Sequence, residues 1–390
     1  MSEWRIATLG AVANLQNGYA FKPAQLTGRG APVVRIRQLL DASAEVDYSD
    51  VQVPEQFWIE DGDLIFSWSG TLAAAVWGRG PAILNQHLFK VTSADQAVDL
   101  RWLHLVLDHA IDDLNTKTHG TTMKHITKKV LEAQAVPVPP RAEQRRIIDL
   151  IGGIDVHIGA LSEELQSARA LYRNASSRLW LDVDEMEAPA RALGDVMALD
   201  IDRITLEPDE TYSSAGVLGA GQGLINKGTF RGADTGYAVM NRLRVDQVVM
   251  RKLTAWEGPI TIVPVAFDGF VASNEFPTFS LTSEVRAGWM RHVCRTERLW
   301  EEMKNRVTGS VQRRKRLNPE QLMTVSLPVP SRDAQDLAAA ALDEVDALVG
   351  ALEVELSTTR TLRRALLTAL LRQDLNIPDS YDSLLEKAVV

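Results

Sequence analysis

The sequence predicts an α+β fold in which two similar mixed α/β globular domains are joined by two long helices, which form an antiparallel coiled coil with an internal pseudo-two-fold. Three observations lead to this prediction: a repeat 191 residues apart, two helical stripes of equal length, and two blocks of short strands and turns. The predicted boundaries are 1–140 and 189–330 for the domains, 141–188 and 331–375 for the helices, and 376–390 for a C-terminal tail.

The repeat is ungapped over twelve residues. Residues 154–165 return as 345–356 with six of the twelve positions identical. Two further pairs of segments match at the same or a similar offset: Val136-Pro137-Val138-Pro139 with Leu327-Pro328-Val329-Pro330, and Leu9-Gly10-Ala11-Val12 with Leu193-Gly194-Asp195-Val196. We interpret the chain as one unit written twice. A duplicated binding unit predicts two similar sites for a target with two parts.

Each helical segment carries apolar residues at every third or fourth position. These residues are Ile154, Ile158, Leu161, Leu165, Ala168, Leu171, Ala175 and Leu179 in the first segment, and Val345, Val349, Leu352, Leu356, Thr359, Leu362, Leu366 and Leu370 in the second. Pro139-Pro140 precede the first helix, and Pro330 precedes the second with Ser331 as the expected N-cap. The equal registers predict that the stripes pack on each other. Packing of each stripe on its own globular block is the alternative.

The two predicted domains read as short strands and turns. Strands are expected at 33–37, 63–67, 244–250 and 260–263, and a helix near 100–114. The run Gly219-Ala220-Gly221-Gln222-Gly223 resembles a cofactor-binding loop, but no helix opens after it. We therefore interpret this run as a turn.

Composition limits the class of protein. With 45% apolar residues, 390 residues supply enough material for two buried cores. The single cysteine, Cys294, excludes an internal disulfide and fits a reducing compartment. The N-terminus has no apolar signal core, and the longest apolar stretch contains Asp343, Glu344 and Asp346. We expect a cytoplasmic protein with no membrane partner.

The net charge of −9 is unevenly distributed along the chain. The two predicted helices hold most of the negative charge, whereas two basic runs without any carboxylate lie at equivalent places in the two halves, 117–129 and 304–316. Matched basic runs favour contact with phosphate groups over a merely solvated surface, which is the alternative.

An ordered set of motifs, occurring twice, carries a resemblance that covers nearly the whole chain. In the first half the motifs are Leu9-Gly10-Ala11-Val12, Asn85-Gln86-His87-Leu88, Gly120-Thr121-Thr122-Met123-Lys124, Val136-Pro137-Val138-Pro139-Pro140 and Glu143-Gln144-Arg145-Arg146-Ile147. In the second half they are Leu193-Gly194-Asp195-Val196, Trp256-Glu257-Gly258, Asn274-Glu275, Gly309-Ser310-Val311-Gln312-Arg313 and Leu327-Pro328-Val329-Pro330. The chain resembles the DNA specificity subunit of type I restriction–modification enzymes. It departs from the pattern where Glu-Gln becomes Ala334-Gln335, so we expect the second helix start to dock its partner less tightly.

The resemblance implies a non-catalytic subunit with two target-recognition domains, each reading one half of a split sequence in double-stranded DNA. The helices would set the gap and dock two adenine methyltransferase (modification) subunits, and motor-nuclease (restriction) subunits would complete the complex. No cofactor is expected in this chain. The partner subunits would use S-adenosylmethionine, and ATP with Mg for restriction.

The sequence lacks the motifs of catalytic subunits, which supports the interpretation as a non-catalytic subunit. An adenine methyltransferase needs an Asn/Asp-Pro-Pro-Tyr/Phe loop, and the nearest match, Asn318-Pro319-Glu320-Gln321, lacks it. The sequence has no Walker lysine and no zinc-ligand cluster, so no catalytic residue and no metal site are predicted. His119 and His125 beside Lys124 are expected to be solvated or to face phosphate rather than to bind a metal.

The DNA-facing residues are predicted from chemistry. Phosphate contacts need cations and glycine-containing loops, and base reading needs Arg, Gln, Asn or Lys with aromatic packing. In the basic runs the candidates are Thr121, Thr122, Lys124, His125, Lys128, Lys129, Ser310, Gln312, Arg313, Arg314, Lys315 and Arg316. The candidate base readers are Arg35, Arg37, Gln38, Trp68 and Arg79 in the first half, and Lys227, Arg231, Arg251, Lys252 and Trp256 in the second. Trp68 and Trp256 could equally be core residues.

Two other classes of function stay open at this stage. One is a scaffold with two protein-binding heads on a coiled coil, which would not need matched basic runs. The other is an enzyme whose centre follows no familiar motif. The recognised bases and the length of the gap cannot be derived from composition.

Overall fold

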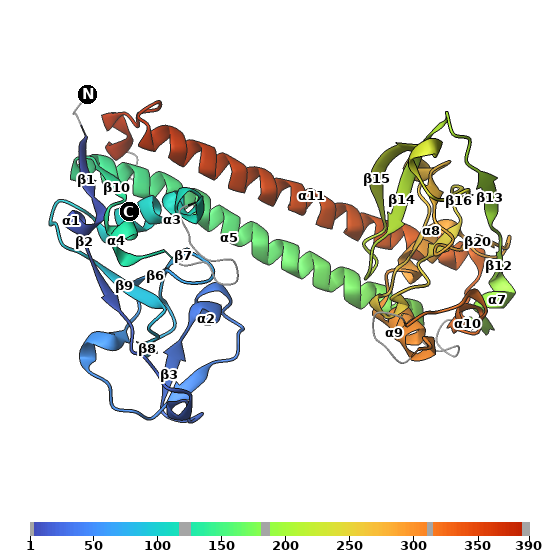
Figure 1. Cartoon of the computed structure of the whole chain (residues 1–390), viewed down its shortest axis with the longest axis horizontal. Coiled ribbons are helices and arrows are strands. Elements are labelled where there is room, and N and C mark those ends of the chain that lie inside the picture. The colour runs from blue at the N-terminus through green and yellow to red at the C-terminus, as the bar shows by residue number, and fades with distance from the viewer. Residues whose placement is uncertain (1–3, 117–125, 181–187, 310–314, 384–390) are drawn as a thin grey trace. The chain divides into compact units, whose positions relative to one another are not determined.

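The computed structural model describes residues 4–116, 126–180, 188–309 and 315–383. The chain divides into two compact units: Met1–Ala160 with Leu356–Val390, and Leu161–Glu355. Each unit combines a globular α+β part with segments of both long helices, as Figure 1 shows by the labels α5 and α11. The predicted fold class, two mixed domains joined by two long helices, is confirmed.

The first unit contains two four-stranded sheets. The first sheet is antiparallel and has the order β2 (Ala13–Asn17), β9 (Leu88–Ser93), β6 (Leu64–Ser67) and β7 (Ala73–Val76). The second sheet has the order β4 (Asp47–Ser49), β3 (Ala31–Val34), β8 (Ala82–Leu84) and β5 (Trp58–Ile59), with β3 and β8 parallel. The helices are α1 (Leu9–Val12), α2 (Ile36–Leu40), α3 (Leu100–Thr116) and α4 (Lys128–Glu132).

The second unit repeats this arrangement with one additional strand. Its first sheet has the order β12 (Met197–Leu199), β20 (Thr278–Leu281), β17 (Val248–Met250) and β18 (Ile260–Ile262). Its second sheet has the order β13 (Asp202–Thr205), β16 (Val239–Arg242), β19 (Val271–Ala272), β14 (Thr211–Val217) and β15 (Leu224–Arg231), with β14 and β19 parallel. The helices are α7 (Leu193–Val196), α8 (Ala287–Val293), α9 (Glu297–Arg306) and α10 (Pro319–Met323).

The Leu-Gly-x-Val openings form the same joint in both units. In the first, β1 (Arg5–Thr8) pairs antiparallel with β10 (Ala135–Val138), and in the second β11 (Ala190–Ala192) pairs with β21 (Ser326–Pro328). The leucine after each first strand donates its N–H across the joint, over 2.8 Å in both units. A Cβ at Gly10 would lie 3.0 Å from Glu132, so glycine lets α1 approach α4 closely.

The long helices α5 (Arg141–Ser177) and α11 (Arg332–Leu371) run antiparallel inside each unit. In the first unit Ile147 of α5 shares a core with Leu370 of α11, and further along, Asp155 of α5 binds Arg363 of α11 at 2.9 Å. In the second unit Arg169 binds Glu353 at 2.6 Å. The same helices also supply residues to the domain cores, so packing on a partner helix and packing on a domain occur together.

The predicted stripes were wrong at one position in each helix. Leu171 and Leu362, which occupy equivalent places, are 54% and 58% exposed, while the next residues, Tyr172 and Arg363, turn inward. The physical reason is that a helix of 3.6 residues per turn drifts away from a strict three-or-four spacing. Both inward residues make polar contacts: Tyr172 bonds His292 over 2.8 Å, and Arg363 bonds Asp108 over 3.0 Å.

Strand limits also differ from the predictions. The segment predicted as a strand at 33–37 divides, because β3 ends at Val34 and α2 begins at Ile36, with Arg35 as its N-cap. The segment 244–250 is a strand only at Val248–Met250. The turn predicted at Gly219–Gly223 is confirmed: it connects β14 to β15, and Gln222 donates to the carbonyl of Gly219 over 3.1 Å. Ser331 caps α11, since its hydroxyl accepts from the N–H of Ala334 at 3.3 Å.

A buried glutamine near the start of each long helix fastens that helix to its domain. Gln144 accepts a hydrogen bond from the N–H of Asp99 (2.9 Å) and donates to the carbonyls of Ala97 and Pro139, each over 2.8 Å. It is 1% exposed. The Asp99 end of these contacts lies one residue before α3. We call this set of contacts the glutamine clip.

The glutamine clip recurs in the second unit. Gln335, which is fully buried, accepts from the N–H of Arg286 (2.8 Å) and donates to the carbonyls of Glu284 and Pro330, each over 2.9 Å. Arg286 is the N-cap of α8. Although Ala334 stands where the first half has Glu143, the glutamine contacts are the same. What the second unit lacks is the bond from the indole of Trp4 to Glu143 (2.9 Å).

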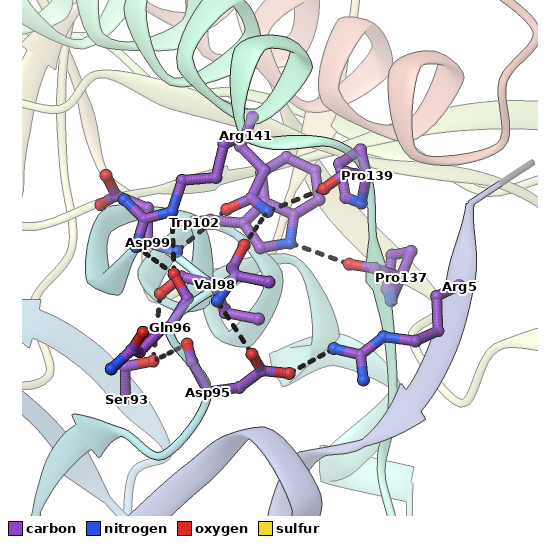
Figure 2. Close-up of polar contacts among 12 residues, drawn as sticks. Arg5, Ser93, Asp95, Gln96, Val98, Asp99, Trp102, Pro137, Pro139 and Arg141 are labelled. Atoms are coloured by element: carbon purple, nitrogen blue, oxygen red, sulfur yellow. Dashed lines mark hydrogen bonds and ion pairs between the residues drawn. The ribbon is translucent and has the colours of Figure 1, made fainter. Parts of the chain in front are cut away.

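Further polar contacts hold the loop of the first glutamine clip, as Figure 2 shows. Asp95 pairs with Arg5 and accepts from the N–H of Ala97 at 2.8 Å. The hydrogen bond from Ala97 is the main reason that the pKa of Asp95 lies below its usual value. Trp102 donates its indole N–H to the carbonyl of Pro137 over 2.8 Å, and Arg141 donates to the carbonyl of Gln96 over 3.0 Å.

Buried polar groups also join α8 to both long helices in the second unit. His292 is fully buried and lies between the hydroxyl of Tyr172 and the carboxylate of Asp343, 2.8 and 2.6 Å away. Burial lowers the pKa of His292 and raises the pKa of Tyr172 to about 12. Arg295 binds Asp346 through two hydrogen bonds of 2.6 and 2.7 Å, which lower the pKa of Asp346.

In the first unit the chain after α11 returns to α5. Arg146, 8% exposed, pairs with Asp379 and with Asp382 (2.6 Å), and Tyr381 donates to Asp149 over 2.6 Å. The hydrogen bond from Arg146 lowers the pKa of Asp382. Part of the segment predicted as a tail is therefore an ordered piece of the first unit.

Replacing either clip glutamine by alanine should lower the free energy of unfolding by about 1–3 kcal/mol, because each change leaves buried backbone groups without partners. Chemical denaturation followed by tryptophan fluorescence measures this. The matched control is Gln96→Ala, in the same loop as the first clip, whose side chain is exposed. Equal stability of Gln144→Ala and Gln96→Ala would contradict the role assigned to the clip.

Candidate nucleic-acid interface

Both basic runs are held to their domains by one equivalent hydrogen bond. In the first unit Ile126 donates its N–H to the carbonyl of Trp68 over 3.1 Å, and in the second Leu317 donates to the carbonyl of Lys252 over 3.0 Å. Ile126 and Leu317 are themselves 191 residues apart. Trp68 directly follows the strand β6, and Lys252 lies two residues beyond the end of β17. We call this contact the loop anchor.

Further backbone pairing brings the second unit's motif segments to the same place. Thr308 and Arg316, which both belong to the basic run, exchange two hydrogen bonds of 2.8 and 2.9 Å. Thr254 donates to the carbonyl of Lys315 at 3.0 Å, and Lys252 donates to the carbonyl of Glu275 at 2.9 Å. The segments around Trp256, Glu275 and Arg316, far apart in sequence, therefore meet at one site.

The first unit has the corresponding contact. Trp68 donates its N–H to the carbonyl of His87 over 3.5 Å, as Lys252 does to Glu275. The indole of Trp68 stacks on Phe89 with ring centroids 5.8 Å apart, and it packs against the core of the domain. Lys128 and Lys129 lie at the start of α4; Lys128 donates to the carbonyl of Leu15 over 2.9 Å, and Lys129 is exposed.

The remaining first-half candidates gather at α2. Arg35 and Arg37 share the carboxylate of Asp47, at 3.1 and 3.5 Å, and Arg79 donates to the carbonyl of Gln38. Gln38 is 1% exposed, and its amide accepts from the N–H of Arg35 and donates to the carbonyl of Glu45. Its hydrogen-bonding groups are thus used inside the domain, and the guanidinium groups around it are the exposed part of this cluster.

The second-half candidates fall into two groups. Arg251, Lys252, Trp256, Lys315 and Arg316 lie around the loop anchor. Lys227 and Arg231 lie on β15, an edge strand of the five-stranded sheet, where Arg231 pairs with Asp209 at 3.0 Å. Eight candidates lie outside the described residues: Thr121, Thr122, Lys124, His125, Ser310, Gln312, Arg313 and Arg314. His119 lies outside them as well.

The ion pairs at this site differ in how easily they can exchange partners. Arg316 binds Glu275 at 2.9 Å, with the two side chains 49% and 34% exposed. An exposed pair of this kind contributes about 0–1 kcal/mol, so a phosphate could replace the carboxylate at little cost. Arg251 is more buried, and besides Glu257 it donates to the carbonyl of Leu253 at 3.0 Å. Its contacts position the Trp256 turn.

Several polar groups close to the loop anchors have no hydrogen-bond partner. They are the indole nitrogens of Trp68 and Trp256, Oε1 of Gln86 and Oε2 of Glu275, all buried. Buried polar groups in native proteins are generally bonded, so a cluster of exceptions indicates a place where a ligand or a structural change supplies partners. Trp68 and Trp256 are both half-buried, so their exposure is intermediate between that of a core residue and that of a base reader.

The described residues contain no group of three or more His, Cys, Asp or Glu side chains placed to hold a metal ion. Within the same residues, no helix combines the length and the hydrophobicity needed to cross a bilayer. Sequence reasoning missed the loop anchor because the bond is made by backbone atoms. The signal that could have found it is the repeat, since Ile126 and Leu317 match at the same offset as the helices.

The similarity to known proteins agrees with this geometry. The family model described as "Type I restriction modification DNA specificity domain" matches residues 1–166. The specificity subunit of the type I restriction enzyme EcoBI from Escherichia coli is 30% identical over 165 residues, which are 42% of this chain and 35% of that protein. Residues 1–166 of this chain are therefore similar to the type I restriction–modification DNA specificity domain.

Further proteins resemble this chain at lower sequence identity. The MjaVIII specificity subunit from Methanocaldococcus jannaschii is 25% identical over 122 residues, 31% of this chain and 29% of that protein. The chain thus aligns with about a third of the length of these two relatives. The crystal structure of a type I specificity subunit from M. genitalium shares the fold over 94% of this chain and 96% of its own, with a TM-score of 0.58 and 15% identity. A chain from a structure of a type I restriction–modification system has a TM-score of 0.55 at 16% identity, covering 95% and 98%.

The basic run of the second unit gives a direct test of phosphate contact. Replacing Arg313, Arg314 and Lys315 together by alanine should weaken binding to all DNA sequences alike and shrink the salt slope by roughly 0.9 for each phosphate that is no longer neutralised. Titration of labelled duplexes at several salt concentrations measures both quantities. Lys124, Lys128 and Lys129 should behave in the same way in the first unit.

The matched control keeps the charge and changes the side chains: Arg313→Lys, Arg314→Lys and Lys315→Arg. This variant should retain the salt slope. If the alanine variant bound with unchanged affinity and slope, the run would be ordinary solvated surface. A changed base preference with retained affinity would instead mean that the run reads bases.

Proposed function

We propose that this chain is the sequence-specific DNA-binding subunit of a type I restriction–modification complex, and that it has no catalytic centre of its own. Each domain reads one half of a bipartite site in double-stranded DNA. The observation that carries this proposal is the loop anchor, which holds a basic run at the same place in both units. If both domains place their phosphate contacts in the same way, the loop anchor and the positive charge of the basic run are expected to recur together.

The long helices provide the second part of the proposal. They set the gap between the half-sites and dock two adenine methyltransferase subunits, and motor-nuclease subunits join for restriction. The partners then supply S-adenosylmethionine, and ATP with Mg, while this chain needs no cofactor. The complex acts on double-stranded DNA in the cytoplasm. The similarity of residues 1–166 to the type I specificity domain supports this set of partners.

A scaffold with two protein-binding heads is less well supported. Such a protein would have no reason to repeat carboxylate-free basic runs at equivalent anchored positions. The similarity of residues 1–166 to a DNA specificity domain also weighs against it.

The test is exchange of one domain. The chain is produced with its methyltransferase, residues 15–119 are replaced by the corresponding segment of another family member, and the methylated sequences are mapped. One half-site should change and the other should stay, because each unit has its own core and its own anchor. The unexchanged complex is the control, and it should methylate a bipartite site. A simultaneous change of both half-sites would mean that the units form one composite reader.

A further inference from the structure

A hollow of about 540 Å³ opens beside the loop anchor of the second unit. Four polar side chains line it: Arg203, Asn241, Lys252 and Asn274. The rest of its lining is apolar and consists of Ile201, Val239, Pro277 and Pro319. Lys252 is the residue whose carbonyl forms the anchor, so the hollow is continuous with the candidate interface.

The hollow is cationic, since its lining contains no carboxylate. Among the described residues, neither Arg203 nor Lys252 has a carboxylate partner. Most other arginines of this domain are neutralised; Arg242 next to the hollow, for example, pairs with Asp202 at 2.8 Å. Cations that stay unpaired in the free protein are available to a ligand with acceptor atoms.

Asn241 contributes a hydrogen-bond acceptor, whereas Arg203 and Lys252 contribute donors. It is 1% exposed, its amide nitrogen donates to the carbonyl of Phe276 over 3.1 Å, and its Oδ1 has no partner. The strand register places Arg203 directly opposite Asn241, so both side chains lie on one face of the sheet. The hollow therefore presents the exposed guanidinium of Arg203 as a donor, and behind it lies a buried acceptor without a partner, which a ligand reaches only if the lining moves.

This pair of groups fits a G·C pair best, because a guanidinium offers two donors and guanine alone shows two adjacent acceptors in the major groove. In the major groove a G·C pair shows the N7 and O6 acceptors of guanine beside the N4 amino donor of cytosine. Arginine is suited to the two guanine acceptors, and an amide oxygen is suited to the amino group. We propose that the hollow is a base-reading subsite of the second domain, in which Arg203 and Asn241 read a G·C pair. This inference rests on the proposed function.

The comparison between the units agrees with a specificity role. The glutamine clip and the loop anchor recur in both, but Arg203 lies on β13, and the corresponding sheet of the first unit ends at β5 with no strand in that place among the described residues. Features that both units share are expected to serve a function common to both domains. A lining that only the second unit has is expected to read a base in only one half-site.

The test uses the whole complex with its methyltransferase. Binding and methylation are measured on duplexes with each base pair of the second domain's half-site replaced in turn, for the unaltered chain and for Arg203→Ala. The variant should lose discrimination at one G·C position by about tenfold or more, with the other positions and the other half-site unchanged. Asn241→Ser, which retains an acceptor, should have a smaller effect at that same position.

The matched control is Arg242→Ala, which removes the same charge from the neighbouring position on the opposite face and should leave every position read as before. Three results for Arg203→Ala overturn the subsite alone: unchanged discrimination, an equal loss for all sequences as a phosphate contact gives, or a loss at an A·T position. If the unaltered complex showed no preference for any sequence, the proposed function itself would fail, and the subsite with it.

Discussion

The structure depends on one buried side chain used twice. Gln144 and Gln335 each close three hydrogen bonds between the first turn of a long helix, the strand end before it and the loop before a domain helix. Because both the donors and the acceptor of a buried amide are satisfied, the contact fixes direction as well as distance. Each recognition domain is thereby attached to its helix in the same orientation. The coiled coil, the domain cores and the loop anchors all extend from this joint.

Beyond that joint, the two units share some features and differ in others. The Leu-Gly-x-Val turn, the paired end strands and the loop anchor are the same in both. The surfaces beside the anchors differ: Trp68 in the first unit corresponds to Lys252 in the second, and the second sheet has an additional strand. Under the proposed function, a constant frame with changed linings lets one fold read two different half-sites. In our proposal the frame supplies phosphate contacts and the linings supply base contacts.

The sequence predicted the structural features that occur in both units, because a repeat shows which residues have the same role in each half. It led to the fold class, the Ser331 cap and the turn at Gly219–Gly223. It failed at Leu171 and Leu362, where helical drift turns the next residue inward, and at Arg35, where a strand gives way to a helix cap. The hollow at Arg203 could not be predicted, since it depends on which residue of β16 lies opposite β13. Strand pairing over such a distance leaves no local pattern in the sequence. The placing of Gln38 was missed for a similar reason, as its partner is a carbonyl seven residues away.

The central claim is that the length of the two long helices, to which the glutamine clips attach the domains, determines the length of the gap in the DNA site. The most direct measurement is methylation mapping after inserting four residues into both long helices, between Ala160 and Leu161 in α5 and between Glu355 and Leu356 in α11. These points are the borders of the two units, so the contacts within each unit are kept. Each insertion adds about 6 Å of helix, close to two base-pair steps. The account predicts a longer gap with both half-sites unchanged. An unchanged gap, or altered half-sites, would contradict it.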